Sequence, residues 1–139
     1  MELQKKKEFL ALCSRASLIA GKAILEIYNS DFAVEQKDDK SPLTLADKNA
    51  HNAIMSFLEN SDIPVLSEEG VHDGFETRKN WNQLWIVDPL DGTKEFVKRN
   101  GEFTVNIALV ENNIPTLGVI YSPVFKDLYF AAKGIGSFK

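Results

Sequence analysis

The sequence predicts an α+β domain in which two helices pack on one face of a mainly antiparallel sheet. Two observations lead to this class. In the first 60 residues apolar side chains recur at steps of three and four, whereas beyond residue 60 they gather in short or alternating runs bounded by turn residues. The runs follow one another through short connections, which favours antiparallel pairing.

The first predicted helix ends near Asn29, and its apolar face carries Phe9, Leu12, Cys13, Ala16, Ile19, Ala20, Ala23, Ile24, Ile27 and Tyr28. A polar, proline-containing loop at residues 37–42 precedes a second helix, predicted over residues 44–59. Thr44 stands three residues before Asp47, the spacing of a capping arrangement at a helix start. Cys13 falls on the apolar face, which indicates a buried structural thiol.

The predicted strands are short. Apolar runs at residues 63–67 and 84–88 are followed by an alternating run at residues 103–110. Three further strands are expected at residues 114–121, 127–132 and 136–139, and residues 93–98 have the composition of a short helix. No internal repeat or linker interrupts the pattern, so we expect one domain.

Composition narrows the class of protein. The chain has 139 residues, 26% of them charged, and a net charge of −4. Its longest basic run is Lys5-Lys6-Lys7, which argues against a nucleic-acid polymer as partner. No apolar stretch reaches the roughly 20 residues of a transmembrane helix. A single cysteine forms no internal disulfide, which fits the cytoplasm; peripheral association with the inner membrane is compatible with these features.

Acidic residues end two of the predicted strands. Asp88 and Asp91 stand three apart after one apolar run, and Glu68-Glu69 follows the earlier run. Each motif alone has a simpler interpretation, as a turn aspartate or a solvated acidic turn. Together they offer the carboxylate oxygens that Mg²⁺ prefers, and the carbonyl of Leu90 lies between the two aspartates as a further oxygen donor. Of the two glutamates, Glu68 has the better spacing for a ligand.

Gly92 and Thr93 follow Asp91 directly. A glycine lets the backbone approach an anion closely, and free N–H groups at a helix start at Thr93 can contact phosphate. The sequence therefore predicts metal-dependent phosphoryl chemistry. His51 and His72 lack metal-ligand spacing to each other, so we expect them on a helix face or at the surface.

These motifs carry a resemblance to a known family. The run Asp88-Pro89-Leu90-Asp91-Gly92-Thr93, with Glu68-Glu69 upstream, is similar to the signature of lithium-sensitive, Mg²⁺-dependent phosphomonoesterases. This family includes inositol monophosphatase, fructose-1,6-bisphosphatase and the bisphosphate nucleotidases. Residues 37–47 and 94–108 resemble most the bacterial 3'(2'),5'-bisphosphate nucleotidases, and the resemblance covers essentially the whole chain.

The resemblance implies roles for named residues. The implied metal ligands, for Mg²⁺ as cofactor, are Glu68, Asp88, Asp91 and the carbonyl of Leu90. The implied catalytic residues are Glu68 and Thr93, which position the attacking water, and Asp47, which is hydrogen-bonded to Thr93. The implied substrate-binding residues are Glu68, Leu90, Asp91, Gly92 and Thr93.

The resemblance also implies a substrate, 3'-phosphoadenosine 5'-phosphate from sulfate assimilation, hydrolysed to AMP and phosphate. Its fold is an αβαβα arrangement of which residues 1–139 would be the N-terminal, metal-binding half, with the C-terminal domain absent. Two alternatives stay open: an inositol or sugar phosphate as substrate, and a catalytically incomplete half-domain that only binds metal or a partner. The edge of the final strand predicts self-association of the chain.

Overall fold

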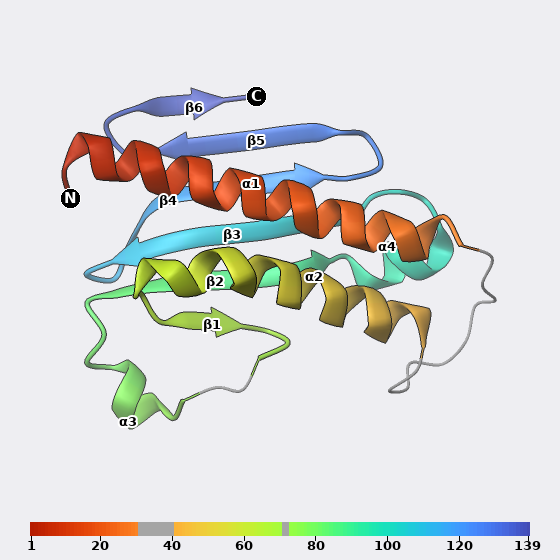
Figure 1. Ribbon diagram of the computed structural model, residues 1–139, viewed down its shortest axis with the longest axis horizontal. Helices are drawn as coiled ribbons and strands as arrows, with labels where there is room; N and C mark the ends of the chain where they lie inside the picture. Colours follow the sequence, from red (N-terminus) through yellow and green to blue (C-terminus); the bar gives the residue numbers. More distant parts are fainter. Residues whose placement is uncertain (31–40, 71–72) are drawn as a thin grey trace.

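A six-stranded sheet and two long helices form the two layers of the structure (Figure 1). This computed structural model describes residues 1–30, 41–70 and 73–139. The predicted fold class is confirmed, since α1 and α2 lie side by side across one face of a mainly antiparallel sheet. Most of the predicted loop at residues 37–42, including Lys37 and Asp39, and also His72, lie outside the described residues.

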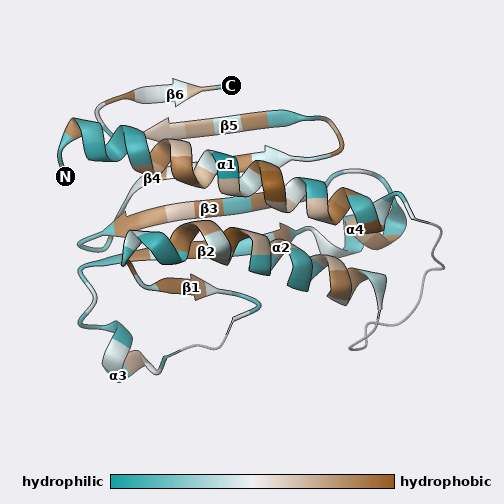
Figure 2. Cartoon of the chain, in the orientation of Figure 1, coloured by the Kyte–Doolittle hydropathy of each residue, from teal (hydrophilic) through white to brown (hydrophobic). Residues whose placement is uncertain are grey.

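The first helix, α1 (Leu3–Tyr28), begins before the first apolar residue of its periodic pattern because a turn of lysines and Glu8 continues the helix. Its buried face comprises Phe9, Leu10, Cys13, Ala16, Ser17, Ala20, Gly21 and Ile24. Cys13 is fully buried, as predicted, and burial raises the pKa of its thiol to about 12. Figure 2 shows the hydrophobic residues gathered in the middle turns of α1 and along β3.

The second helix, α2 (Pro42–Leu58), starts two residues before the predicted start, and the predicted capping role of Thr44 and Asp47 is wrong. Ser41 is the N-cap, and its Oγ accepts a hydrogen bond from the backbone N–H of Thr44 at 3.1 Å. Pro42 at the first helical position favours this earlier start, because its fixed φ suits the first turn. Asp47 is consequently in the second turn, where it is buried.

The strands follow in chain order across the sheet: β1 (Val65–Ser67), β2 (Gln83–Asp91), β3 (Thr104–Glu111), β4 (Ile114–Ser122), β5 (Asp127–Ala132) and β6 (Gly136–Phe138). Only the β1–β2 pair is parallel among them. Three short helical segments lie between the strands or precede them: η1 (Glu59–Ser61), α3 (Phe75–Arg78) and α4 (Thr93–Lys98). The prediction of a helix at residues 93–98 is confirmed.

Alternation along the strands divides the sheet into two faces. On β3, Val105, Ile107 and Leu109 are buried beneath the helices. Trp85 of β2 is fully buried there, with its ring centroid 5.6 Å from that of Phe9 on α1. These contacts join the two layers into one core.

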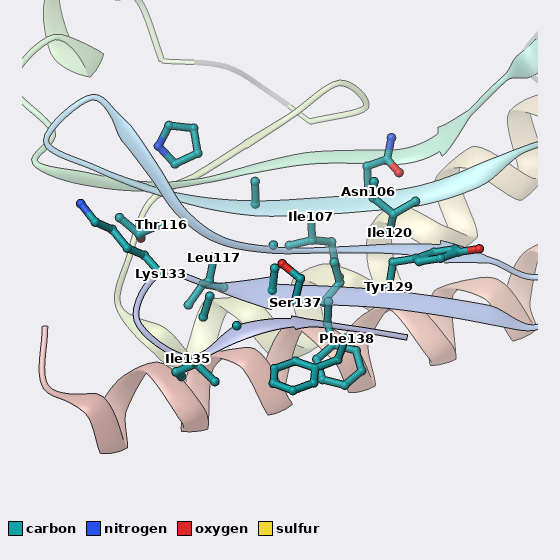
Figure 3. A pocket seen from close by; sticks show the side chains of 18 of the residues that line it. Asn106, Ile107, Thr116, Leu117, Ile120, Tyr129, Lys133, Ile135, Ser137 and Phe138 are labelled. Atoms are coloured by element: carbon teal, nitrogen blue, oxygen red, sulfur yellow. The ribbon is translucent and has the colours of Figure 1, made fainter.

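The sheet face turned away from α1 and α2, here called the open face, carries Ile86, Asn106, Ala108, Gly118, Ile120 and Tyr129. A shallow groove of about 1070 Å³ runs along it (Figure 3). Ile86, Ile120 and Tyr129 are each 43–48% exposed. The described residues therefore leave an apolar sheet surface in contact with solvent.

The strand β2 departs from its predicted form. It does not end at Asp88 but continues through Pro89 to Asp91. Asp88 pairs with Asn106 and Asp91 pairs with Thr104, so a register shift places three steps of β2 opposite two of β3. The shift buries Pro89 and Leu90 and leaves Asp91 exposed.

Candidate metal and phosphate site

The parallel pairing of β1 and β2 places the acidic ends of both strands at one edge of the sheet. Ser67 is the register partner of Val87, and the N–H of Glu68 donates to the Val87 carbonyl at 3.2 Å. Glu68, directly after β1, and Asp88, in β2, therefore lie side by side at the same end of the two strands. The sequence alone does not predict this arrangement, because it depends on β1 and β2 pairing in parallel.

Asp88 shows how closely the acids are gathered. Burial, together with a side-chain hydrogen bond to Glu68 and the negative charges of Glu68, Asp91 and Asp47, raises the pKa of its carboxyl to about 7. The structure thus brings Asp47 of α2, Glu68 after β1, and Asp88 and Asp91 of β2 into one carboxylate cluster.

The chemistry of the cluster fits a hard cation. All of its donors are oxygen atoms, and Asp88 Oδ1 is buried with no hydrogen-bond partner within the described residues. In the described part of the chain, no three carboxylate, histidine or cysteine side chains converge to enclose an ion as they stand. Glu68, Asp88 and Asp91 are the side chains of the cluster that would hold such a cation.

Gly92 and Thr93 complete the predicted site next to this cluster. Gly92 has a φ of +98°, and a Cβ there would lie 3.2 Å from the carbonyl oxygen of Glu102. Its own carbonyl accepts from the N–H of Phe96 at 3.0 Å, which starts α4 at Thr93. Thr93 is exposed at this start, and Leu90 places its side chain in the core.

Two polar contacts at the cluster were not predicted. Asn106 of β3 donates from Nδ2 to Asp91 Oδ2 at 2.9 Å. On α2, the helix placement expected for His51 is confirmed, and its Nδ1 lies 2.8 Å from Ser67 Oγ. No spacing in the sequence indicates either contact, because both join elements 15 or 16 residues apart.

Comparison with protein families identifies the family to which this chain belongs. Residues 5–139 match the model of the inositol monophosphatase family. The chain belongs to this family. Among solved structures, an inositol monophosphatase from Zymomonas mobilis has 28% identity and a TM-score of 0.77, over 95% of this chain and 50% of that one.

The nucleotidase branch of the family is more similar. The 3'(2'),5'-bisphosphate nucleotidase CysQ of Salmonella typhimurium is 54% identical over 119 residues, which are 83% of this chain and 48% of that protein. The crystal structure of CysQ from Bacteroides thetaiotaomicron superposes with a TM-score of 0.89 at 55% identity, covering 94% of this chain and 48% of that chain. The predicted resemblance to the bisphosphate nucleotidases is therefore confirmed. The chain spans about half the length of these relatives.

No helix among the described residues is both long and apolar enough to cross a membrane. Localisation in the cytoplasm stays a prediction from the sequence.

Proposed function

We propose that this chain carries the metal site and phosphate site of a Mg²⁺-dependent 3'(2'),5'-bisphosphate nucleotidase. The proposed substrate is 3'-phosphoadenosine 5'-phosphate. A water oxygen bonds to the 3'-phosphorus, the bond from phosphorus to the 3'-oxygen breaks, and AMP and phosphate are released. The observation that supports this most is the carboxylate cluster around Asp88 in a chain 54% identical to a named nucleotidase.

The cluster alone would repel a phosphate, because all its members are acidic. We assign the cation to the side chains of Glu68, Asp88 and Asp91 and to the carbonyl of Leu90. When bound, Mg²⁺ offsets the charge of the phosphate and favours deprotonation of the attacking water. This requirement explains why an acidic chain can act on an anionic substrate.

The remaining residues act on the water and the phosphate. The Thr93 hydroxyl and the Glu68 carboxylate orient the water, and the backbone of Gly92 and Thr93 contacts the phosphate. Asp47 holds Thr93 in place; α2, which carries Asp47, packs beside α4, which begins at Thr93. Because α4 has six residues, the phosphate contact depends on the local backbone rather than on a long helix dipole.

Phosphate release tests the proposal. The substrates are 3'-phosphoadenosine 5'-phosphate, inositol 1-phosphate and fructose 1,6-bisphosphate, each with MgCl₂ or with EDTA. Asp88→Asn should lower release from the nucleotide by at least about 100-fold, because it removes a charged oxygen ligand. The matched control is Asp127→Asn, since Asp127 pairs with Lys139 at 3.6 Å on β5, away from the cluster.

Each outcome distinguishes the alternatives. Release that persists in EDTA or in Asp88→Asn would overturn the proposal. Faster release from inositol 1-phosphate would identify that compound class as the substrate. Mg²⁺ binding without release from any substrate would overturn the proposed activity and favour the half-domain that only binds metal.

A further inference from the structure

Asn106 stands between the two aspartates of the carboxylate cluster. Its Cα is the register partner of Asp88 across the β2–β3 ladder. Its side-chain amide reaches the other aspartate, donating from Nδ2 to Asp91 Oδ2 at 2.9 Å. The register shift in β2 makes both relationships possible, because it brings Asp91 back beside β3 after the two buried residues that follow Asp88.

The orientation of this amide is set by a second hydrogen bond. Thr104 Oγ1 donates to Asn106 Oδ1 at 3.0 Å, and Thr104 is itself the register partner of Asp91. An amide has one donating end and one accepting end. If it turned over, Oδ1 would face the Asp91 carboxylate and repel it. Thr104 therefore holds the donating end toward Asp91.

We propose that Asn106, oriented by Thr104, is a positioning residue that holds Asp91 by Oδ2 and leaves Oδ1 of Asp91 for the cation. This inference rests on the proposed function, in which Asp91 is a Mg²⁺ ligand. An exposed carboxylate otherwise samples several rotamers, and fixing it on metal binding costs conformational entropy. Because the hydrogen bond already orders the Asp91 carboxylate in the metal-free protein, less entropy is lost when the cation binds.

A neutral donor suits this position better than a basic one. A lysine or arginine would order Asp91 equally well, but its charge would oppose the cation and weaken metal binding. The amide orders the carboxylate and leaves the negative charge of the cluster unchanged. On its other side, β3 pairs Asn106 with Ile120 of β4, whose apolar side chain cannot compete for the amide (Figure 3).

The same strand pair contains a matched control. At the far end of β2, Gln83 Nε2 donates to Glu111 Oε2 of β3 at 3.0 Å, and these two residues are also register partners. This bond joins an amide to a carboxylate across the same ladder, away from the carboxylate cluster. Its removal measures the general effect of losing such a bond from the sheet.

The experiment titrates MgCl₂ into the 139-residue chain by isothermal calorimetry, with thermal unfolding measured in parallel. Asn106→Leu, of similar size but without the amide, should raise the Mg²⁺ Kd by about 10- to 100-fold, as loss of an outer-shell partner does. Thr104→Val should raise it less, because the amide is kept but is free to turn over. Gln83→Leu should leave the Kd unchanged.

The outcomes separate the inference from the function on which it rests. Unchanged Kd in Asn106→Leu, when Asp88→Asn abolishes binding, would overturn the role of Asn106 alone. An equal rise in Kd for Gln83→Leu would also overturn it, since the effect would then be one of sheet stability. Absence of Mg²⁺ binding by the wild type would overturn the proposed metal site and this inference together.

Discussion

His51 Nδ1 and Ser67 Oγ are 2.8 Å apart, and this hydrogen bond ties α2 to the residue immediately before Glu68. His51 lies one helical turn after Asp47, so α2 both supplies an acid to the cluster and holds the end of β1. Ser67 Oγ also accepts from the N–H of Glu69 at 3.4 Å. Burial lowers the pKa of His51, with the charge of Glu69 opposing it, and this shift favours the neutral ring.

Replacing His51 should loosen the acidic turn. His51→Ala removes one hydrogen bond, worth about 1 kcal/mol of unfolding free energy. The Mg²⁺ Kd should rise by about 10-fold, because Glu68 is then less well placed. Calorimetry and thermal unfolding measure the two effects. Asn52→Ala, an exposed neighbour on α2, is the control, and wild-type values of both quantities in His51→Ala would show that this contact has no such role.

Thr93 should affect turnover rather than metal binding. Thr93→Ala removes the hydroxyl assigned to the attacking water, which is needed mainly in the transition state. We expect phosphate release to fall by about 10²- to 10⁴-fold, while the Mg²⁺ Kd stays near that of the wild type. Thr77→Ala on α3, also exposed, controls for loss of a threonine. Full turnover in Thr93→Ala would exclude the assignment.

The raised pKa of Asp88 predicts how the metal-free protein responds to pH. The folded pKa is about 7 against an ordinary value of 3.8, so between these values the folded state binds the extra proton. The stability present at low pH is therefore lost as pH rises through 7. In EDTA, Asp88→Asn should unfold at a temperature a few degrees higher than the wild type at pH 8.

At pH 5 the same comparison should give a smaller difference, because Asp88 is then protonated in the folded state and only part of the loss between pH 3.8 and 7 has occurred. Thermal unfolding at both pH values, with Asp127→Asn as control, makes the measurement. A Tm difference that is the same at pH 5 and pH 8 would contradict the prediction. A larger Tm difference at pH 8 than at pH 5 would show that the ionised cluster destabilises the metal-free protein.

Self-association of the chain remains a prediction, now with a defined surface. The open face exposes Ile120 and Tyr129, and within the described residues no strand pairs with the outer edge of β6. Sedimentation velocity should show association that rises with concentration. Ile120→Lys should reduce it, and Leu18→Lys, a similar change on exposed α1, should not. A wild-type monomer at every concentration would contradict it.

The sequence predicted the helices and most strand positions well, because hydrophobic period is a local signal. The roles of the strand-end acids stay a prediction. The sequence failed at Thr44, where Pro42 decided the helix start, and at Asp88, where β2 continued through a proline. Asn106 and His51 could not be predicted as part of the site. Their contacts depend on the register of β2 against β3 and on how α2 crosses β1, which local patterns do not encode.

Gly21 of α1 allows this helix to pack closely on the sheet. A Cβ at this position would strike the ring of Tyr121 on β4, lying 2.7 Å from Cδ2, so a larger residue requires either that ring or α1 to move. Yet α1 supplies no member of the carboxylate cluster. A substitution such as Gly21→Ala should therefore behave as a conditional allele in a growing cell, permissive in the cold and null in the heat, with chemistry intact wherever the protein folds.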